Sequence, residues 1–426
     1  MIKKSFFGLI KPKIEYDSLK DISPLPEKVA TPESITLFIR GPLNQTLNIN
    51  VGDKVKTGCK IFSPEGNGEY AISTVTGKVA AISPFNGDYE KTFTAVSIDV
   101  SENDETDEHF TALIKKPDME NFAGYLGFAP GKPCVKIIAD SEKPIKKVVV
   151  CGTDSDLATV TSQYVLKFQT DAVKSGISIL KKITGGSKII MAAPHYLVHE
   201  AGQTGADEVK LIDSLYPAAI PKIMMKNNFG TVVPEGRTCE DLGACFISAE
   251  AVASIGKAFD KGQIPAEKIF TLVKKDGTRT LVSAKIGTPL KEVLKACKII
   301  TGEKDRIIFG GPMTGCSVYS ENHPVLPDTD SIIIQDKDDI TLVSDYPCIN
   351  CGECTRICPA NIPINMLVRF LEAGQYEEAA DQYDLFSCIE CGLCSYVCVA
   401  KIPVFQYIKL AKYELGLINT VEDTND

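Results

Sequence analysis

The stretch CINCGECTRICP at residues 348–359, with CIECGLCSYVCV at residues 388–399, determines how the end of this chain must fold. Each run holds four cysteines with the spacing C-x2-C-x2-C-x3-C. Three cysteines at two-residue intervals can wrap one side of an iron–sulfur cube, whereas the fourth reaches only the cube of the other run. The spacing therefore predicts two [4Fe–4S] clusters with crossed ligands. The predicted ligands are Cys348, Cys351, Cys354 and Cys398 for one cluster, and Cys388, Cys391, Cys394 and Cys358 for the other.

The residues around these cysteines favour clusters over zinc. Gly352 and Gly392 let the backbone turn tightly, so that amide N–H groups can face the sulfurs. A zinc site built from two CxxC pairs is the alternative, but zinc needs only four ligands and leaves a third cysteine at the same interval unexplained. Residues 364–384 between the runs have good helix propensity and predict a helix pair. We expect no repeat larger than the cysteine motif itself.

Composition excludes several classes of protein. The 426 residues are too many for one ordinary core and predict two to four domains. A net charge of −9 argues against a nucleic-acid partner. No apolar run is long enough to span a bilayer, and FFGLI at residues 6–10 is too short for a signal peptide. The fifteen cysteines are odd in number and mostly clustered, which favours metal ligands in a reducing compartment. We therefore expect a cytoplasmic protein, associated with a membrane only through partner subunits.

Hydrophobic patterning predicts a multidomain α/β plus β chain. After an N-terminal arm (1–34), residues 35–115 contain short strand-like runs, among them LNINV at 47–51. The turns VGDKVKTG (51–58) and TVTGKVAAISP (74–84) resemble the hammerheads of a lipoyl-like barrel-sandwich domain. Because no lysine follows Lys60 in the interval where a carrier lysine would lie, we expect a scaffold and not a swinging arm.

After residue 115 the hydrophobic pattern changes from short strand-like runs to an alternation of strand-like and helical runs. Residues 116–264 alternate strand-like runs, including VKIIA at 135–139 and GTVVP at 230–234, with helical stretches at 163–185 and 245–262. This alternation predicts a Rossmann-like domain with a largely parallel sheet. Residues 265–338 predict a β-grasp-like unit, with a hairpin turning at an Asp-Gly pair and one helix. Residues 339–426 predict a helical dicluster ferredoxin domain.

With these motifs the chain resembles the RnfC family of peripheral, cluster-bearing subunits, or a soluble relative such as the proline-reductase-associated electron-transfer protein. The resemblance rests on VGDKVKTG, on IIFGGPMTG (307–315) and most specifically on CIECGLCSYVCVAKIPVFQYIKLAK (388–412). It implies a barrel-sandwich hybrid, an α/β domain like the flavin subunit of complex I, a β-grasp (SLBB-like) unit and a dicluster module, in that order. It also implies donor and acceptor proteins in a multi-subunit complex.

Two departures from the family pattern affect the expectation that the chain binds FMN and oxidises NADH. Members that oxidise NADH carry a GxGGAGFPT loop whose amides cradle the FMN phosphate. Residues 123–132 read AGYLGFAPGK instead, and Tyr125 and Leu126 would obstruct the approach of backbone to phosphate. The family element NGAECEP becomes CGTDSDL at 151–157. The sequence thus predicts a relay of single electrons through two clusters, with an NADH-oxidising flavoprotein and an assembly scaffold with structural clusters as the alternatives.

A few other residues invite a functional hypothesis. His195 and His199 are one helical turn apart and could bind a metal, but no third ligand has an obvious spacing, so polar residues at a helix start are the better interpretation. Cys245 and Cys316 each lie beside a glycine, where a thiol could be exposed and redox-active. Isolated cysteines are more often small buried apolar residues.

Overall fold

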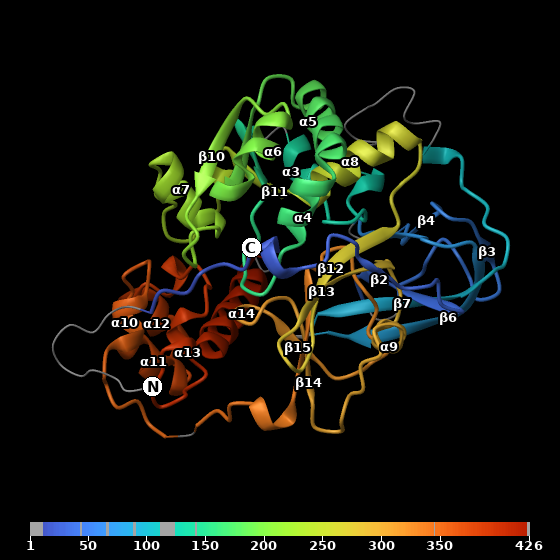
Figure 1. The fold of residues 1–426 in the computed structure, drawn as a ribbon. Helices are drawn as coiled ribbons and strands as arrows, with labels where there is room; N and C mark the ends of the chain where they lie inside the picture. Colours follow the sequence, from blue (N-terminus) through green and yellow to red (C-terminus); the bar gives the residue numbers. More distant parts are fainter. Residues whose placement is uncertain are drawn as a thin grey trace. The chain divides into compact units, whose positions relative to one another are not determined.

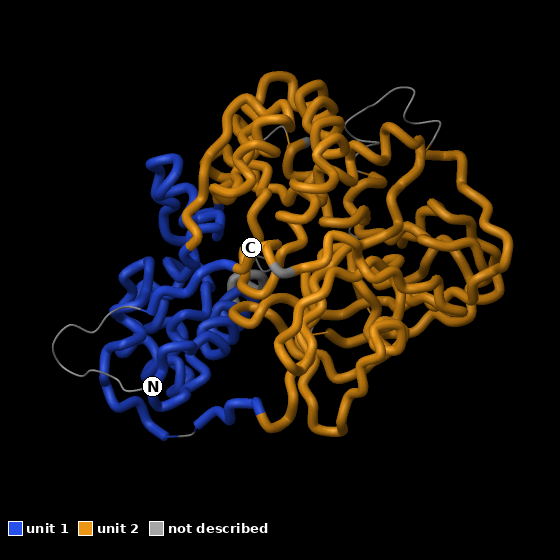
Figure 2. Tube along the Cα trace, viewed as in Figure 1, with its two compact units in different colours: residues 1–16, 215–238, 339–426 blue, residues 17–214, 239–338 orange. Residues whose placement is uncertain are grey.

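The computed structural model describes residues 12–42, 45–64, 68–87, 91–110, 124–140, 143–344 and 346–423. The chain divides into two compact units, which Figure 1 colours along the sequence and Figure 2 colours separately. Unit 1 comprises residues 1–16, 215–238 and 339–426, and unit 2 comprises residues 17–214 and 239–338. The fold is a mixed α/β multidomain one, as the sequence predicts.

The first β-rich part of unit 2 is an antiparallel sheet with the strand order β2-β7-β6-β3, accompanied by a two-stranded sheet β4-β5. On β2 every second side chain is buried, which places Ile35, Leu37 and Ile39 in one core. The strands are β2 (Ser34–Arg40), β3 (Lys54–Val55), β4 (Lys60–Phe62), β5 (Tyr70–Ile72), β6 (Gly77–Asn86) and β7 (Thr92–Val100).

The prediction of a strand at residues 47–51 is wrong. One backbone bond joins the N–H of Asn48 to the carbonyl of Phe62 at 3.0 Å, and side chains make the other contacts described here. The Asn48 amide donates to the carbonyl of Lys60 at 3.1 Å and accepts from the N–H of Phe62 at 2.9 Å. The N–H of Asn50 donates to the carboxylate of Asp53 at 2.8 Å, which forms a turn. Asparagine and aspartate side chains compete with backbone pairing in this way.

A four-stranded parallel sheet forms the next part of unit 2, with the order β10-β9-β8-β11. Its strands are rich in buried aliphatic residues, as expected where helices cover a parallel sheet. The strands are β8 (Lys147–Cys151), β9 (Lys188–Pro194), β10 (Glu208–Ile212) and β11 (Ala244–Ser248). The helices are α4 (Thr161–Phe168), α5 (Thr170–Thr184), α6 (Val198–Gln203) and α8 (Ala249–Lys261). The predicted α/β alternation is confirmed.

Three local assignments in this region are corrected by the structure. VKIIA is the helix α3 (Val135–Ala139), because the Cys134 carbonyl accepts the N–H groups of Ile137 and Ile138. Residues 231–234 form no strand. The start of the helix expected at 245–262 is strand β11, since pairing with β8 outweighs the local propensity.

A six-stranded sheet completes unit 2, with the order β1-β13-β12-β16-β14-β15. β12 and β13 pair as the predicted antiparallel hairpin, and Gly277 adopts a positive φ of 79° at its turn. The elements are β1 (Glu27–Lys28), β12 (Glu267–Val273), β13 (Arg279–Lys285), α9 (Leu290–Ala296), β14 (Arg306–Phe309), β15 (Cys316–Val318) and β16 (Ser331–Gln335). The hairpin and the single helix expected here are confirmed.

Unit 1 is helical in its C-terminal part. α11 (Ile364–Glu372) and α12 (Tyr376–Tyr383) are the helix pair predicted between the cysteine runs. The other helices are α7 (Pro221–Phe229), α10 (Glu353–Ile357), α13 (Leu393–Tyr396) and α14 (Val404–Asp423). Within the described ranges, no helix is both long and apolar enough to cross a membrane.

Candidate metal centre

The two cysteine runs adopt the same local fold. We call residues 348–358 the first cysteine loop and residues 388–398 the second. The first is followed by α11 and the second by α14 (Figure 1), and an Ile-Pro pair precedes each helix. Left-handed residues recur forty positions apart: Asn350 and Glu390 (φ 55° and 56°), Gly352 and Gly392 (71° and 72°), and Asn361 and Lys401 (59° and 58°). The repeat therefore extends beyond the cysteines, and the expectation of no larger repeat is wrong.

Backbone amides donate to cysteine sulfurs at corresponding places. The N–H of Asn350 donates to Cys348 Sγ, and the N–H of Glu390 donates to Cys388 Sγ, each at 3.4 Å. The N–H of Ile402 donates to Cys398 Sγ at the same distance. Such N–H···S contacts stabilise the negative charge of thiolates and of the cluster they bind.

The two loops lie within electrostatic reach of each other. Burial raises the pKa of the Cys391 thiol to about 12, and Cys388 and Cys358 add to the rise. Burial also raises the pKa of the Cys388 thiol, and Cys358 again contributes in the same direction. Cys354 acts similarly on the pKa of Cys394. Cys354 and Cys358 of the first loop therefore lie near enough to thiols of the second loop to interact with them electrostatically.

The environments of the two loops differ. Cys391 and Cys394 are each 8% exposed, whereas Cys351, the counterpart of Cys391, is an exposed residue. The first loop thus presents a ligand side chain to the surface, and the second loop keeps its central cysteines inside.

Two residues outside the cysteine runs fix the second loop. The Tyr216 hydroxyl donates to the carbonyl of Cys391 at 2.7 Å. Lys412 Nζ donates to the carbonyl of Cys388 at 2.9 Å and pairs with Glu390 at 2.8 Å. Sequence reasoning missed both residues. Lys412 lies in the segment 388–412 that carries the family resemblance. Tyr216 is far from the cysteine runs in sequence and belongs to no motif that could have pointed to it.

The first loop has a weaker counterpart of this support. The Arg356 guanidinium donates to the carbonyl of Cys351 at 3.2 Å and pairs with Glu353 at 2.7 Å. The Arg356 side chain is 47% exposed, against 17% for Lys412. Since solvent screens an exposed charge, Lys412 interacts more strongly with the Cys388 carbonyl than Arg356 does with that of Cys351.

The donor set suits iron–sulfur clusters in its chemistry. Eight thiols in two matching loops could hold two cubes, and the amide donors face sulfur atoms as they do around a cluster. Among the described residues, no group of three or more His, Cys, Asp or Glu side chains is arranged to hold a metal ion. The fit therefore rests on the spacing of the cysteines and on the N–H···S contacts.

Comparison with known proteins agrees with this picture. The family model of the 4Fe-4S dicluster domain matches residues 347–402. The C subunit of the Na+-translocating ferredoxin:NAD+ oxidoreductase complex of Acetobacterium woodii is 26% identical over 85% of this chain and 86% of its own length. The C subunit of the proton-translocating complex of Clostridium ljungdahlii is 27% identical over 96% of this chain and 94% of its own length. The chain is thus similar over most of its length to the C subunits of two ion-translocating ferredoxin:NAD+ oxidoreductase complexes.

Solved structures give a more distant likeness. An NAD+-reducing [NiFe]-hydrogenase in the H2-reduced state has a TM-score of 0.46 at 14% identity, over 71% of this chain and 64% of the other. The same kind of enzyme in its air-oxidised state has a TM-score of 0.44 at 15% identity, over 62% and 56%.

The segment that departs from the flavin loop is packed with side chains. Ala123 lies outside the described residues. Leu126 is fully buried, and the N–H of Gly127 donates to the Tyr70 hydroxyl at 2.9 Å. Lys60 Nζ lies 4.4 Å from the ring centre of Tyr70 and 5.2 Å from that of Tyr125. The described residues of this segment are thus engaged with other groups of the chain itself.

The acidic residues of the second departure are also engaged. Asp154 accepts from the N–H of Ser162 at 2.8 Å and from Gln163 Nε2 at 2.9 Å, and burial raises its pKa to about 6. Asp156 accepts from the N–H and the hydroxyl of Thr314 at 2.8 and 2.6 Å. Both carboxylates therefore bind the chain's own donors.

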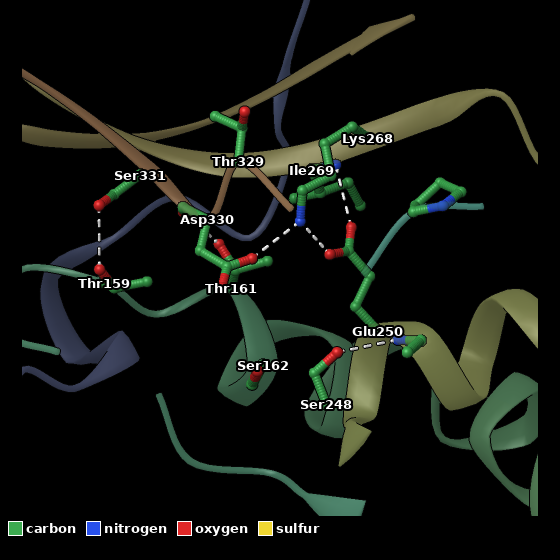
Figure 3. Close-up of polar contacts among 12 residues, drawn as sticks. Thr159, Thr161, Ser162, Ser248, Glu250, Lys268, Ile269, Thr329, Asp330 and Ser331 are labelled. Carbon is green, nitrogen blue, oxygen red and sulfur yellow. Dashed lines mark hydrogen bonds and ion pairs between the residues drawn. The ribbon is translucent and has the colours of Figure 1, made fainter. Parts of the chain in front are cut away.

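A buried ionic cluster, which the sequence did not reveal, lies where β12, α8 and the start of β16 meet (Figure 3). Lys268 is fully buried and pairs with Glu250 and, at 2.9 Å, with Asp330. Burial lowers the pKa of Lys268, but the two carboxylates outweigh it and the net shift is upward. The Thr161 hydroxyl donates to the Asp330 carbonyl at 2.9 Å. The cluster joins elements of the parallel and six-stranded sheets.

The remaining candidates are placed as follows. His195 begins a short 3-10 helix, and His199 lies in α6 with its Nε2 2.9 Å from Gln203 Nε2. Cys316 is half-buried on β15. Cys245 is fully buried on β11, which agrees with the more common interpretation of an isolated cysteine and not with the alternative of an exposed thiol. A strand in a helix-covered parallel sheet buries both of its faces.

Proposed function

We propose that this RnfC homologue is an iron–sulfur electron-transfer subunit that relays single electrons through two [4Fe–4S] clusters between partner redox proteins. The observation that carries the proposal is the pair of matching cysteine loops, whose thiols lie near enough to interact electrostatically. The dicluster model that matches residues 347–402 supports it independently.

We assign the ligands in the crossed pattern that the spacing predicts. Each loop gives its first three thiols to its own cluster and its fourth to the other. One cluster is held by Cys348, Cys351, Cys354 and Cys398, and the other by Cys388, Cys391, Cys394 and Cys358. When bound, the clusters supply one-electron redox chemistry.

The chain's own residues make the two positions unequal. The exposed Cys351 brings one cluster position to the surface, where electrons can pass to or from a partner. The second loop holds its two central cysteines, Cys391 and Cys394, away from water, and Tyr216 and Lys412 fix its backbone. A buried position linked to a surface position is the arrangement that a relay needs.

The finer fold assignment is also a proposal. It comprises an N-terminal arm (1–34), a barrel-sandwich hybrid domain (35–115), a flavin-subunit-like α/β domain (116–264), an SLBB-like β-grasp domain (265–338) and a ferredoxin domain (339–426). The parallel sheet, the Asp-Gly hairpin and the helices of residues 353–423 support the last three.

The partners follow from the relatives. A dicluster chain needs an electron donor and an electron acceptor, and the relatives are named as subunits of ion-translocating oxidoreductase complexes. We propose that this chain likewise works in a complex of redox subunits. Any association with a membrane would then be peripheral and made through those subunits.

Anaerobic analysis of the purified protein tests the relay against a flavoprotein. We expect about eight irons per chain, no flavin on extraction, and no bleaching of the visible spectrum by NADH. The filled segment around Leu126 and the engaged Asp156 support this expectation. Stoichiometric FMN with bleaching by NADH would instead establish the NADH-oxidising alternative and overturn the proposal.

Reduction and re-oxidation of the clusters distinguishes the relay from the scaffold alternative. A relay requires clusters that dithionite reduces and that a mild oxidant returns to their first state. Clusters that bind stoichiometrically but do not cycle would show that they only stabilise the helical domain.

A further inference from the structure

Two isolated cysteines of unit 2 lie with their sulfur atoms in contact. Cys134 Sγ and Cys245 Sγ are 3.1 Å apart, although the residues are 111 positions apart in sequence. Cys245 is fully buried on β11, and Cys134 is half-buried just before α3. A disulfide bond joins sulfurs at about 2.05 Å, so a relative movement of about 1 Å would bring this pair to bonding distance.

The two thiols are chemically unequal. The hydrogen bond between them lowers the pKa of Cys134 and raises that of Cys245. The thiolate is the nucleophile in thiol–disulfide exchange, and it must also be reached from solvent. Cys134 meets both conditions better, whereas the buried Cys245 is placed to attack only Cys134. The pair thus has an attacking thiol and a resolving thiol.

Two further cysteines lie near the pair. Cys151 and Cys239 lie near enough to interact electrostatically: burial raises the pKa of Cys151 to about 12, and Cys134 and Cys239 add to it. The Cys151 thiol, however, points to the carbonyl of Val149 at 3.9 Å. In the part of the chain that the structure describes, no group of three or more ligating side chains is placed to hold a metal ion.

We propose that Cys134 and Cys245 form a redox-active dithiol, which a small disulfide oxidises to an intramolecular disulfide bond and a dithiol reductant restores. The Cys134 thiolate attacks one sulfur of R–S–S–R, forms a mixed disulfide and releases one thiolate, which takes the proton of Cys245. The Cys245 sulfur then attacks Cys134 and releases the second RS group as a thiol, with the proton that Cys134 had lost. Two electrons pass from the protein thiols to R–S–S–R, which leaves as two RSH.

The bond would fix a defined segment. Cys134 ends the segment 124–134, and Cys245 lies three residues before Ser248 at the end of β11. Gly131 of the segment already packs so closely on Ser248 and Ala251 that a methyl group there would lie 2.4 Å from the Ala251 nitrogen. Oxidation would therefore add a covalent link between the two segments, three residues from Gly131 on one side and three residues from Ser248 on the other. Neither thiol belongs to the eight proposed cluster ligands, so the dithiol and the clusters can be tested separately.

The test is a redox titration of the anaerobic holoprotein in mixtures of oxidised and reduced dithiothreitol. After each equilibration, acid quenching, alkylation of free thiols in denaturant and peptide mapping identify the linked cysteines. We expect one linked peptide pair joining Cys134 to Cys245, with two fewer alkyl groups per chain, and an unchanged iron content. Reduced dithiothreitol should restore both thiols.

Matched variants make the outcome decisive. Cys134→Ala and Cys245→Ala should each abolish the linked pair, whereas Cys297→Ala should retain it. Cys297 is a buried cysteine whose thiol faces the Glu27 carboxylate and not another thiol. Circular dichroism verifies folding, and Cys134→Ala keeps the test valid if the buried Cys245→Ala variant does not fold. Alkylation of both cysteines throughout the titration, or a link from Cys134 to Cys151 or Cys239, would overturn the proposal.

Discussion

At the level of single residues, Cys358 decides which loop each cluster depends on. It belongs to the first cysteine loop, yet its charge acts on Cys388 and Cys391 of the second. We therefore expect Cys358→Ala to lose the second-loop cluster, reducing the iron content from about eight to about four per chain. Its electron paramagnetic resonance spectrum should match that of Cys391→Ala. Cys297→Ala is the control, and a spectrum like that of Cys351→Ala would contradict the crossed assignment.

Lys412 is predicted to tune the potential of the cluster at the second loop. Its ammonium group lies against the Cys388 carbonyl and favours the extra electron of the reduced state. Lys412→Met should lower that reduction potential, on the order of 50 mV, since about 59 mV is a tenfold change for one electron. A redox titration followed by electron paramagnetic resonance measures it. Lys409→Met, on the same helix, is the control, and an unchanged or raised potential in Lys412→Met would refute the prediction.

At the level of helices and strands, Asp154 connects the end of β8 to the start of α4. Its pKa is about 6 in the folded chain, against an ordinary 3.8, so the folded state keeps a proton that the unfolded state releases between these pH values. The contribution of Asp154 to the free energy of unfolding is fully present below pH 3.8. It is lost as the pH rises through the folded-state pKa of about 6, and the total loss is about 3 kcal/mol.

Asp154→Asn should remove this dependence. We expect the Tm of the wild-type chain to fall more than that of the variant between about pH 5 and pH 7, because the amide does not titrate. The exposed Asp171→Asn on α5 serves as the control and should behave like the wild type. If Tm changes with pH in the same way in the wild type and in Asp154→Asn, a group other than Asp154 controls the pH dependence of stability.

The contact between α5 and α8 depends on two glycines. A methyl group at Gly176 would lie 2.0 Å from the Val252 carbonyl oxygen, and one at Gly256 would lie 2.2 Å from that of Ala172. Gly176→Ala should therefore force the helices apart and lower the free energy of unfolding by about 3 kcal/mol, as overpacking does. Gly202→Ala on α6 meets no atom within 4 Å and should be neutral or stabilising. Denaturant unfolding compares them, and equal effects would contradict the close packing.

At the level of the whole molecule, the two units should respond differently to loss of iron. Several of the cysteines pack against the helical core around Leu367 and Ile408, so clusters and core form together. Chelation should increase amide exchange throughout residues 346–423, while the parallel sheet β8 to β11 keeps its protection. Hydrogen exchange followed by mass spectrometry measures both. Unchanged exchange in residues 346–423 after complete iron removal would show that the helical core folds without clusters.

Much of the fold follows from local signals. Strand–helix alternation predicts the parallel sheet, and the Asp-Gly turn predicts the β12–β13 hairpin. The prediction of a strand at VKIIA is wrong. Its β-branched residues favour strands, but the buried residues Val135 and Ile138 are spaced as on one face of a helix. The prediction from LNINV is wrong because alternation does not reveal that the Asn48 side chain bonds to the backbone of Lys60 and Phe62.

The eight candidate cluster ligands could be named from the order of residues, since a cube of this size needs thiols at short, fixed intervals along the chain. Which remote groups meet these ligands, and one another, became visible only in the folded chain. Tyr216 reaches Cys391, Lys268 joins Glu250 to Asp330, and Cys134 touches Cys245. Most of these contacts join residues far apart in sequence, and only packing of the core brings them together, so no spacing along the chain could predict them.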